Sequence, residues 1–393
     1  MPMSASDGAL RAWGYLSRVA EPPCAELAAL VQRVGPVEAA ERIRRGQVDG
    51  ELARLTRARC EIDRAAADLE QLARRGGRLI TPDDDEWPVV AFTAFSGSAI
   101  RAKGNGGAPM ALWVQGPARL DQVVQRAAAL VGTRAATAYG EHMAADLAAG
   151  LVERDVAVIS GGAYGIDGAA HRAVLIAEGT TVAVLAGGID IPYPTGHSAL
   201  LHRIGQHGLL VTEYPPGVRP ARHRFLTRNR LVAALGGAAV VVEAGLRSGA
   251  ANTAAWARAL GRIVAAVPGP ATSSASAGCH VLLRNGAQLI TRADEIVELV
   301  GRIGELSLEQ SRPTSVLDGL SQSESQVYEA LPGRGAMSVD EIAVASGLVA
   351  EQVMGRLAIL EVAGLAERDG GRWRLVRAGR ARPAAEGVRA RLV

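Results

Sequence analysis

The chain has 393 residues, of which 48% are hydrophobic and 21% charged, and its formal net charge is +3. Its length predicts two or three domains, and its globular composition excludes a largely disordered chain. Three scattered cysteines give neither a disulfide framework nor a zinc site, and there is no signal-peptide pattern or apolar run of the ~18 residues of a membrane helix. We therefore expect a cytoplasmic protein with no membrane contact, no metal and no cofactor.

The amino-terminal part, residues 1–80, is predicted to be a helical (SAM-like) domain. Residues 24–46 contain two short amphipathic segments that break at Gly35-Pro36, and residues 51–77 contain a longer segment that ends at a glycine pair. Residues 81–110, which include TPDDDEWP and KGNGG, are predicted to be an irregular connection.

Residues 111–300 alternate between strand and helix patterns. Several strands are continuous apolar runs, which is typical of strands buried on both faces of a parallel sheet. The predicted strands are ALWVQG, AAALVG, DVAVIS, TTVAVLAG, GLLVTE, AAVVVEA and RIVAAVP. The predicted helices lie at 137–153, 166–178, 198–207, 229–236, 250–260 and 279–286. This alternation predicts an α/β fold with a doubly wound, mostly parallel sheet.

The joints between these elements are unequal in length. Helix-to-strand joints are tight, whereas strand-to-helix joints are long and rich in Gly, Arg and Tyr. In a doubly wound sheet all strand-to-helix joints lie at the carboxyl edge of the strands, where open α/β sheets bind ligands. One such joint leads into residues 218–230, which hold five arginines and no acidic residue. We therefore expect these arginines to converge at the carboxyl edge.

The carboxyl-terminal part begins with a predicted polar linker at 301–322. Residues 323–378 contain three short helices and a hairpin that turns at Asp369-Gly370. Ser338 and Glu341 form a capping box at the start of the second helix. This order predicts a winged-helix domain, which a tail at 379–393 follows.

Three motifs supply candidate ligand contacts at the carboxyl edge. SGGAYGID is a glycine-rich strand-to-helix turn, where a backbone can approach a ligand closely and a helix N-terminus favours an anion. VGTR, FLTRNR and RSG place arginines at the other joints, and Ser248 also suits a helix cap. Tight packing explains the glycines equally well, and a lone loop arginine is usually a solvated charge.

Aromatic side chains interleave with these arginines. The joints contain Tyr164, Tyr193, Tyr214 and Phe225, although such rings also brace loops. Arginines that hold phosphates, together with aromatic rings that stack on bases, are what single-strand binding requires. The sequence therefore favours a single-stranded nucleic acid as the ligand.

These stretches resemble the DprA family (DNA processing protein A, also called Smf), bacterial proteins that load the recombinase RecA onto single-stranded DNA. The resemblance covers about residues 128–291 in the family's order, through VGTRAATAYG, ISGGAYGIDGAAHRAVL, TVAVLAGGIDIPYP, TEYPPGVRP, RFLTRNRLVAAL, VVVEAGLRSGAANTA, GRIVAAVPG and GCHVLLRNGAQLI. It implies an extended Rossmann-like core, single-stranded DNA binding, homodimerisation, and RecA as the partner in natural transformation and recombination. The residues that we expect to contact DNA are Gly132, Arg134, Gly161, Gly162, Phe225, Arg228, Asn229, Arg230, Arg247, Ser248 and Gly249.

The sequence departs from the family's pattern in three places. Leu226 and Thr227 stand where the family usually has a proline, and its common SGS loop is SGA here. The amino-terminal helices lack a clear GIG of a helix-hairpin-helix. These departures leave open the shape of the 225–230 segment and a DNA role for the amino-terminal helices.

An enzyme is one alternative, namely a Rossmann-type hydrolase of nucleoside monophosphates. Its PGGxGTxxE motif is not supplied by VPGPATSS or VEAGLRSG. Asp167 with His171 lacks the third group of a triad or metal site, and the adjacent Cys279 and His280 point in different directions. Three carboxylates that end strands are expected to hold loop backbone: Asp190, Glu213 and Glu243. We therefore expect a protein that is not an enzyme.

A winged-helix transcription regulator is the other alternative. The predicted recognition helix, AEQVMGRLAILEVA, carries Glu351 and Glu361 against only Arg356, which suits a DNA groove poorly. The wing and tail are basic, with Arg368, Arg372, Arg374 and Arg377. The sequence is therefore compatible with contacts between the wing and DNA phosphates.

Overall fold

The computed structural model describes residues 5–101, 103, 106–301 and 320–376. The chain divides into two compact units, residues 1–307 and 308–393, and each is described by itself. Most of the predicted linker and the whole predicted tail lie outside the described residues. Within the described part, no single helix is long and apolar enough to span a membrane, and one bent helix pair reaches that length and composition only when taken together.

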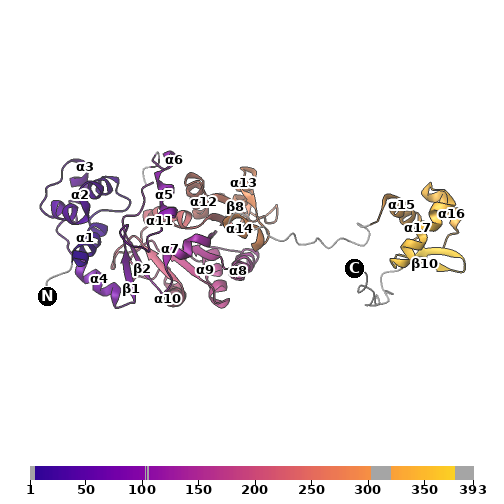
Figure 1. Ribbon diagram of the computed structural model, residues 1–393, viewed down its shortest axis with the longest axis horizontal. Coiled ribbons are helices and arrows are strands. Elements are labelled where there is room, and N and C mark those ends of the chain that lie inside the picture. The colour runs from indigo at the N-terminus through magenta and orange to yellow at the C-terminus, as the bar shows by residue number, and fades with distance from the viewer. Residues whose placement is uncertain (1–4, 102, 104–105, 302–319, 377–393) are drawn as a thin grey trace, which may run out of the picture. The chain divides into compact units, whose positions relative to one another are not determined.

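A nine-stranded sheet organises the larger unit (Figure 1). Its strand order is β1-β2-β6-β5-β4-β3-β7-β8-β9, in which β2 is antiparallel to both neighbours and all other pairs are parallel. The strands are β1 (Gly77–Ile80), β2 (Leu112–Gln115), β3 (Ala127–Val131), β4 (Ala157–Ser160), β5 (Thr181–Val184), β6 (Leu209–Thr212), β7 (Ala238–Val241), β8 (Ile263–Ala266) and β9 (Gln288–Leu289). The predicted mostly parallel α/β sheet is confirmed.

The chain reverses its direction across the sheet at β3. From β3 it proceeds through β4 and β5 to β6 on one side, and it then returns to β7 on the other side of β3. The loops that follow β3 and β7 therefore diverge at the carboxyl edge and leave a crevice between them, the usual ligand position of such sheets.

Helices cover both faces of the sheet. Leu130 and Val240 face one layer, formed by α8 (Ala138–Val152), α9 (Ile166–Ile176) and α14 (Ala293–Val300). Ala129 and Val241 face the other, formed by α11 (Arg222–Leu235), α12 (Gly249–Ala259) and α13 (Ala277–Arg284). This alternation of neighbouring side chains between two apolar layers explains why the strands are apolar throughout. The remaining helices of this part are α7 (Leu120–Val123), η2 (Val124–Arg126), η3 (Thr195–His197) and α10 (Ser198–His207).

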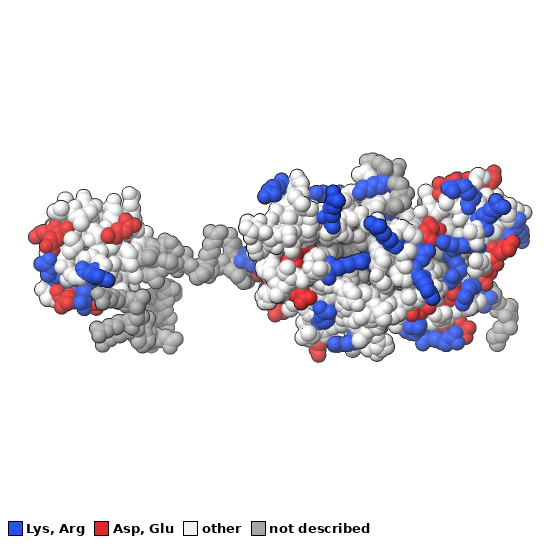
Figure 2. Space-filling model, turned by 180° about the vertical axis from the view of Figure 1, so that it is seen from behind, with Lys and Arg blue, Asp and Glu red and all other residues white. Residues whose placement is uncertain are grey.

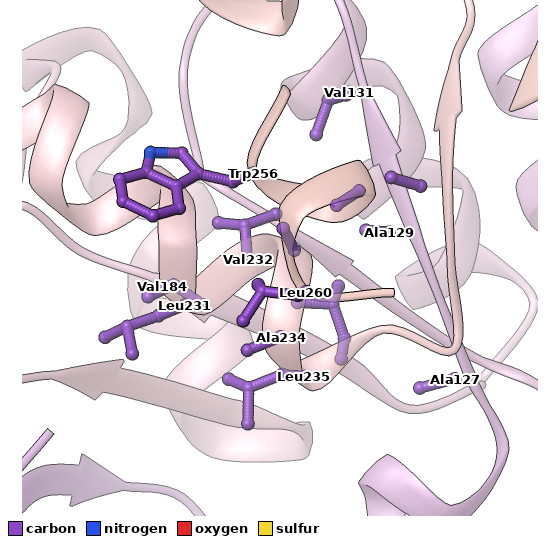
Figure 3. Packing of buried hydrophobic residues seen from close by; sticks show 14 of the residues in the cluster. Ala127, Ala129, Val131, Val184, Leu231, Val232, Ala234, Leu235, Trp256 and Leu260 are labelled. Carbon is purple, nitrogen blue, oxygen red and sulfur yellow. The ribbon is translucent and has the colours of Figure 1, made fainter. Parts of the chain in front are cut away.

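Helix α11 begins earlier than the sequence predicts. The predicted start was residue 229, but the helix starts at Arg222, so FLTRNR lies inside its first three turns. Figure 3 shows its second half packed on the sheet: Leu231, Val232 and Leu235 share one buried cluster with the side chains of β3.

The amino-terminal helices share a core with the sheet. They are α1 (Ala5–Val19), α2 (Ala25–Arg44), α3 (Gly50–Thr56) and α4 (Ala65–Ala73). Trp113 of β2 is fully buried among them, and its indole nitrogen donates to the Ser17 hydroxyl at 3.2 Å. Three short helices then connect β1 to β2: α5 (Val89–Thr93), η1 (Ala94–Ser96) and α6 (Ser98–Arg101).

Two breaks interrupt the helices of this region, and the sequence predicts one of them. The predicted break at Gly35-Pro36 is present as a kink in α2, where Gly35 has φ 80°. The predicted single helix over 51–77 is wrong, because the chain leaves the helix between α3 and α4. The Tyr15 hydroxyl donates to the Cys60 carbonyl at 2.7 Å, a tertiary contact, and Asp63 accepts from the nearby Ala65 amide at 3.1 Å. These two hydrogen bonds fix the interruption.

The second unit is a winged helix, as predicted. Its elements are α15 (Gln322–Ala330), α16 (Val339–Ser346), α17 (Ala350–Val362), β10 (Ala366–Asp369) and β11 (Arg372–Leu375). The Ser338–Glu341 capping box starts α16, and Trp373 closes the apolar core of the unit.

Truncation of Leu231 tests the packing of α11. Leu231→Ala removes a fully buried side chain, and we expect the free energy of unfolding of the larger unit to fall by about 2–5 kcal/mol. Leu226→Ala on the same helix, where the side chain is 49% exposed, is the matched control and changes it by about 0.5 kcal/mol or less. Urea denaturation followed by tryptophan fluorescence measures both, and equal effects would contradict the packing described.

Candidate nucleic-acid interface

A cavity of about 650 Å³ lies at the carboxyl edge of the sheet. Its walls come from the loops after β3, β4, β5, β6 and β7 and from the first turns of α11 and α12. It therefore occupies the crevice where the strand order reverses. On the face shown in Figure 2, Lys and Arg side chains border a hollow in the surface of this unit.

Nine of the eleven residues predicted to contact DNA line this cavity. They are Gly132, Arg134, Gly161, Phe225, Arg228, Asn229, Arg247, Ser248 and Gly249. Gly162 and Arg230 are not among its lining residues. Four distant parts of the sequence thus meet at one site, as the analysis of the joints predicts.

Exposed arginines surround an aromatic pair in this cavity. The ring centroids of Tyr193 and Phe225 are 5.2 Å apart, and the Arg134 guanidinium carbon lies 5.0 Å from the Phe225 centroid. Arg222 and Arg247 are exposed in the same lining. Within the described part of the chain no carboxylate lies within 4 Å of these three guanidinium groups, so they are available to an anion.

Arg228 has a different position from these three. Its side chain is buried, and Nη1 donates to the carbonyls of Gly161, at 2.7 Å, and Val184. Burial lowers the pKa of Arg228 to about 10, and it stays protonated at neutral pH. Arg228 therefore ties α11 to the ends of β4 and β5 and brings positive charge to the floor of the cavity.

Gly161, in the loop after β4, makes room for the Arg228 guanidinium. A Cβ atom on Gly161 would lie 2.5 Å from Nη2 of Arg228, and one on Gly132 would lie 2.3 Å from Ile166. These two glycines are required by contacts within the protein. Gly249, by contrast, has no atom within 4 Å of a hypothetical Cβ and opens toward the cavity.

The expectation that Arg230 contacts DNA does not fit the structure. Arg230, in the middle of α11, is fully buried, and its Nη2 donates to Glu213 Oε1 at 2.7 Å in an ion pair. Arg224 is also engaged, since its Nε donates to Glu21 at 2.6 Å. Because the helix starts at Arg222, successive arginines point to different sides, and only some of them reach the cavity.

The carboxylates at the strand ends hold the loops. Glu243 accepts from the amide of Thr137 at 2.8 Å and from its hydroxyl at 2.7 Å, which anchors the start of α8. Asp190 accepts from the Gly217 amide at 2.8 Å. Glu213 differs from the expectation, because it holds Arg230 and not a loop amide.

The residue pairs considered for catalysis do not act together. Asp167 accepts from the amides of Gly161 and Ala163. The Thr181 hydroxyl donates to the Val158 carbonyl, so it accepts from Nδ1 of His171 at 2.7 Å. Burial lowers the pKa of His171 to about 3, so this imidazole is neutral. Cys279 is buried, which raises its pKa to about 11, and His280 contacts the Gly269 carbonyl. Neither pair is a nucleophile with its base.

Sequence reasoning missed several residues of the cavity. Arg222, Leu226, Thr133 and Thr253 all line it. Arg222 lies in the basic stretch at 218–230 and was in principle detectable there. Thr133 and Leu226 lie within VGTR and FLTRNR, but their uncharged side chains give no signal for a ligand. The positions of Leu226 and Thr253 also depend on how α11 and α12 pack.

Comparison with known proteins agrees with this geometry. The family model of the DNA recombination-mediator protein A matches residues 78–301, more than half of the chain. The chain belongs to this family, also named DprA or Smf. The family's winged-helix domain matches residues 311–372, so the resemblance found in the sequence is confirmed.

Family members of several bacteria are similar to the chain. A Mycobacterium tuberculosis protein, provisionally named DNA processing protein DprA, is 76% identical over 98% of this chain and all of its own length. The Smf protein of Escherichia coli is 37% identical over 69% of this chain and 73% of its own length. The X-ray structure of DprA from Streptococcus pneumoniae matches 78% of this chain and all of its own, with a TM-score of 0.60 and 26% identity.

Replacement of Arg230 separates a structural role from DNA contact. Arg230→Ala leaves the Glu213 carboxylate buried without its partner, and we expect unfolding to become easier by about 3–5 kcal/mol. The double variant Arg230→Met with Glu213→Leu is the control, in which an apolar pair recovers most of that stability. An Arg230→Ala protein of unchanged stability that binds DNA weakly would show instead that Arg230 contacts the ligand.

Proposed function

We propose that this protein binds single-stranded DNA with little sequence preference, through the cavity at the carboxyl edge of the sheet. The observation that carries the proposal is the set of three exposed arginines, Arg134, Arg222 and Arg247, around the Tyr193–Phe225 pair. Guanidinium groups bind phosphates, and aromatic rings stack on any base. A single strand presents both groups at once.

The cavity favours a flexible strand over a duplex. In a duplex the bases are stacked and paired, so the aromatic pair cannot stack on their faces, whereas an unpaired base can turn into the cavity. The lining offers few groups that read base edges: Asn229 already donates to Gly249 and Asn252. Contacts would therefore be mainly with phosphates and ring faces, which are common to all sequences.

Recombination is the process in which we place this activity. The chain belongs to a family described as recombination mediators, and the proposed role is to protect incoming single strands and load RecA onto them in natural transformation. Homodimerisation is part of the same proposal, on the strength of family membership. Since the DNA and the recombinase are both inside the cell, the proposed location is the cytoplasm.

Binding without turnover fits the chemistry of the site. Among the described residues, the acidic groups near the cavity each serve a structural contact, Asp167 with loop amides and Glu243 with Thr137. An enzyme needs a nucleophile, a base and an orienting group at one place. We therefore propose a DNA-binding protein and not a hydrolase.

The winged helix supports the regulator alternative less well. Arg356 of α17 lies 3.7 Å from Glu324, and two arginines of the wing pair with carboxylates, Arg372 with Glu341 and Arg374 with Glu367. Arg377 lies outside the described residues. With these three arginines paired, exposed Arg368 is left as the wing's free cation among its described residues, which is little positive charge for a DNA groove.

Single substitutions in the cavity test the proposal. Arg134→Ala or Arg247→Ala should weaken binding of single strands of any sequence and reduce the slope of log K against log salt by about 0.7 for each lost phosphate contact. Fluorescence anisotropy at several salt concentrations measures both quantities.

The matched control is Arg45→Ala, which removes a positive charge just after the end of α2, at a residue paired with Glu41 at 3.0 Å. It should leave the affinity and the salt slope unchanged. Unchanged binding by both cavity variants, with the fold intact, would refute the proposed site, as would tighter binding of duplex than of single strand.

A further inference from the structure

A second cavity lies on the other side of the segment that leads into α11. Residues 220–222 line the main cavity, whereas Arg219 and Arg224 line the second, which has a volume of about 270 Å³. Its opposite wall comes from the amino-terminal helices and the turns between them, including Arg18, Glu21 and Arg59. The two cavities are thus separated by one stretch of backbone.

The second cavity holds more positive than negative charge. Arg59 Nη2 donates to Glu21 at 3.0 Å, Arg224 Nε donates to it at 2.6 Å, and His223 lies 3.3 Å from it. Arg18 pairs with Asp68 at 2.6 Å. Within the described residues Arg219 has no carboxylate within 4 Å. One carboxylate therefore faces two guanidinium groups, and a third guanidinium is unpaired.

Two of these arginines keep donors for a ligand. Arg219 is exposed and makes no side-chain hydrogen bond within the described part of the chain. The Arg59 side chain is 38% exposed, and among the described residues its hydrogen-bond partners are Glu21 and the Arg18 carbonyl. Arg18 and Arg224 are mostly buried and are paired with Asp68 and Glu21. They therefore contribute only positive electrostatic potential to the second cavity.

Glu21 occupies the position that an anion would take. Its carboxylate accepts charged hydrogen bonds from Arg59 and Arg224 with the lengths that guanidinium–phosphate pairs adopt. Burial acts to raise the pKa of Glu21, but these two arginines lower it below its usual value, so the group is ionised at neutral pH. Glu21 is partly exposed, and a phosphate that arrives from solvent competes with it directly.

We propose that this second cavity is a phosphate site, built by Arg59 and Arg219, which takes a phosphodiester group of the same single strand after the strand crosses segment 218–224. The inference rests on the proposed function, since it extends the DNA path from the main cavity. It also gives the amino-terminal helices a role, because Arg59 and Glu21 both belong to that part of the chain.

The test compares Arg59→Ala with the unmodified full chain on strands of two lengths. A strand of about 4 nucleotides fills the main cavity alone, and one of about 16 nucleotides spans both, on the scale of known single-strand sites. Arg59→Ala should weaken binding of the longer strand several-fold and lower its salt slope by about 0.7, with no effect on the shorter strand. Arg59→Lys, which keeps the charge, should retain most of the slope, and Arg45→Ala should change nothing.

A second variant is expected to act in the opposite direction. Glu21→Gln removes the competing carboxylate, so the longer strand should bind more tightly and with a steeper salt slope. The inference is overturned if Arg59→Ala leaves the longer strand unaffected, if it weakens both strands equally, or if Glu21→Gln weakens the longer strand.

The outcomes separate the two proposals. Loss of short-strand binding in Arg134→Ala, together with an unaffected long strand in Arg59→Ala, retains the main cavity and rejects the second. Unchanged binding of both strands in Arg134→Ala rejects the main cavity itself.

Discussion

The burial of arginines along α11 is the constraint on which the site depends. Arg228 donates to the carbonyls at the ends of β4 and β5, and Arg230 pairs with Glu213 after β6. A buried charge is tolerated only with partners of good geometry, so these contacts permit one position of the helix on the sheet. That position places Arg222, which is exposed, and Phe225, which is half-buried, in the lining of the crevice.

The positive stretch that is prominent in the sequence therefore serves two purposes. Arg224, Arg228 and Arg230 are engaged inside the protein, and Arg219 and Arg222 remain at the surface. Arg134 and Arg247, which come from other loops, complete the charged rim of the cavity. Fewer arginines are available to DNA than the segment contains, because carboxylates and carbonyls elsewhere in the fold bind the others.

The alternating fold was predictable because its apolar strands and long carboxyl-edge joints are local patterns. The start of α11 was not, because arginines in a first turn oppose the helix dipole and favour a loop assignment. Their partners lie far away in the sequence: Glu21 is 203 residues from Arg224, and Glu213 is 17 residues from Arg230. For the same reason the break between α3 and α4 was missed, since the Tyr15 contact with Cys60 that fixes it spans 45 residues. The loop positions of Arg134, Arg247 and Ser248 followed from motifs, whereas the burial of Arg230 depended on a tertiary partner.

The central claim is that a single strand lies in the main cavity with its bases against the aromatic pair. Photo-cross-linking of a single strand that contains 5-iodouracil, followed by mass spectrometry of the digested full chain, tests it most directly. We expect cross-links to Tyr193 or Phe225, which are lost when unlabelled strand is added in excess. Cross-links confined to residues 320–376, with none in the cavity, would contradict it.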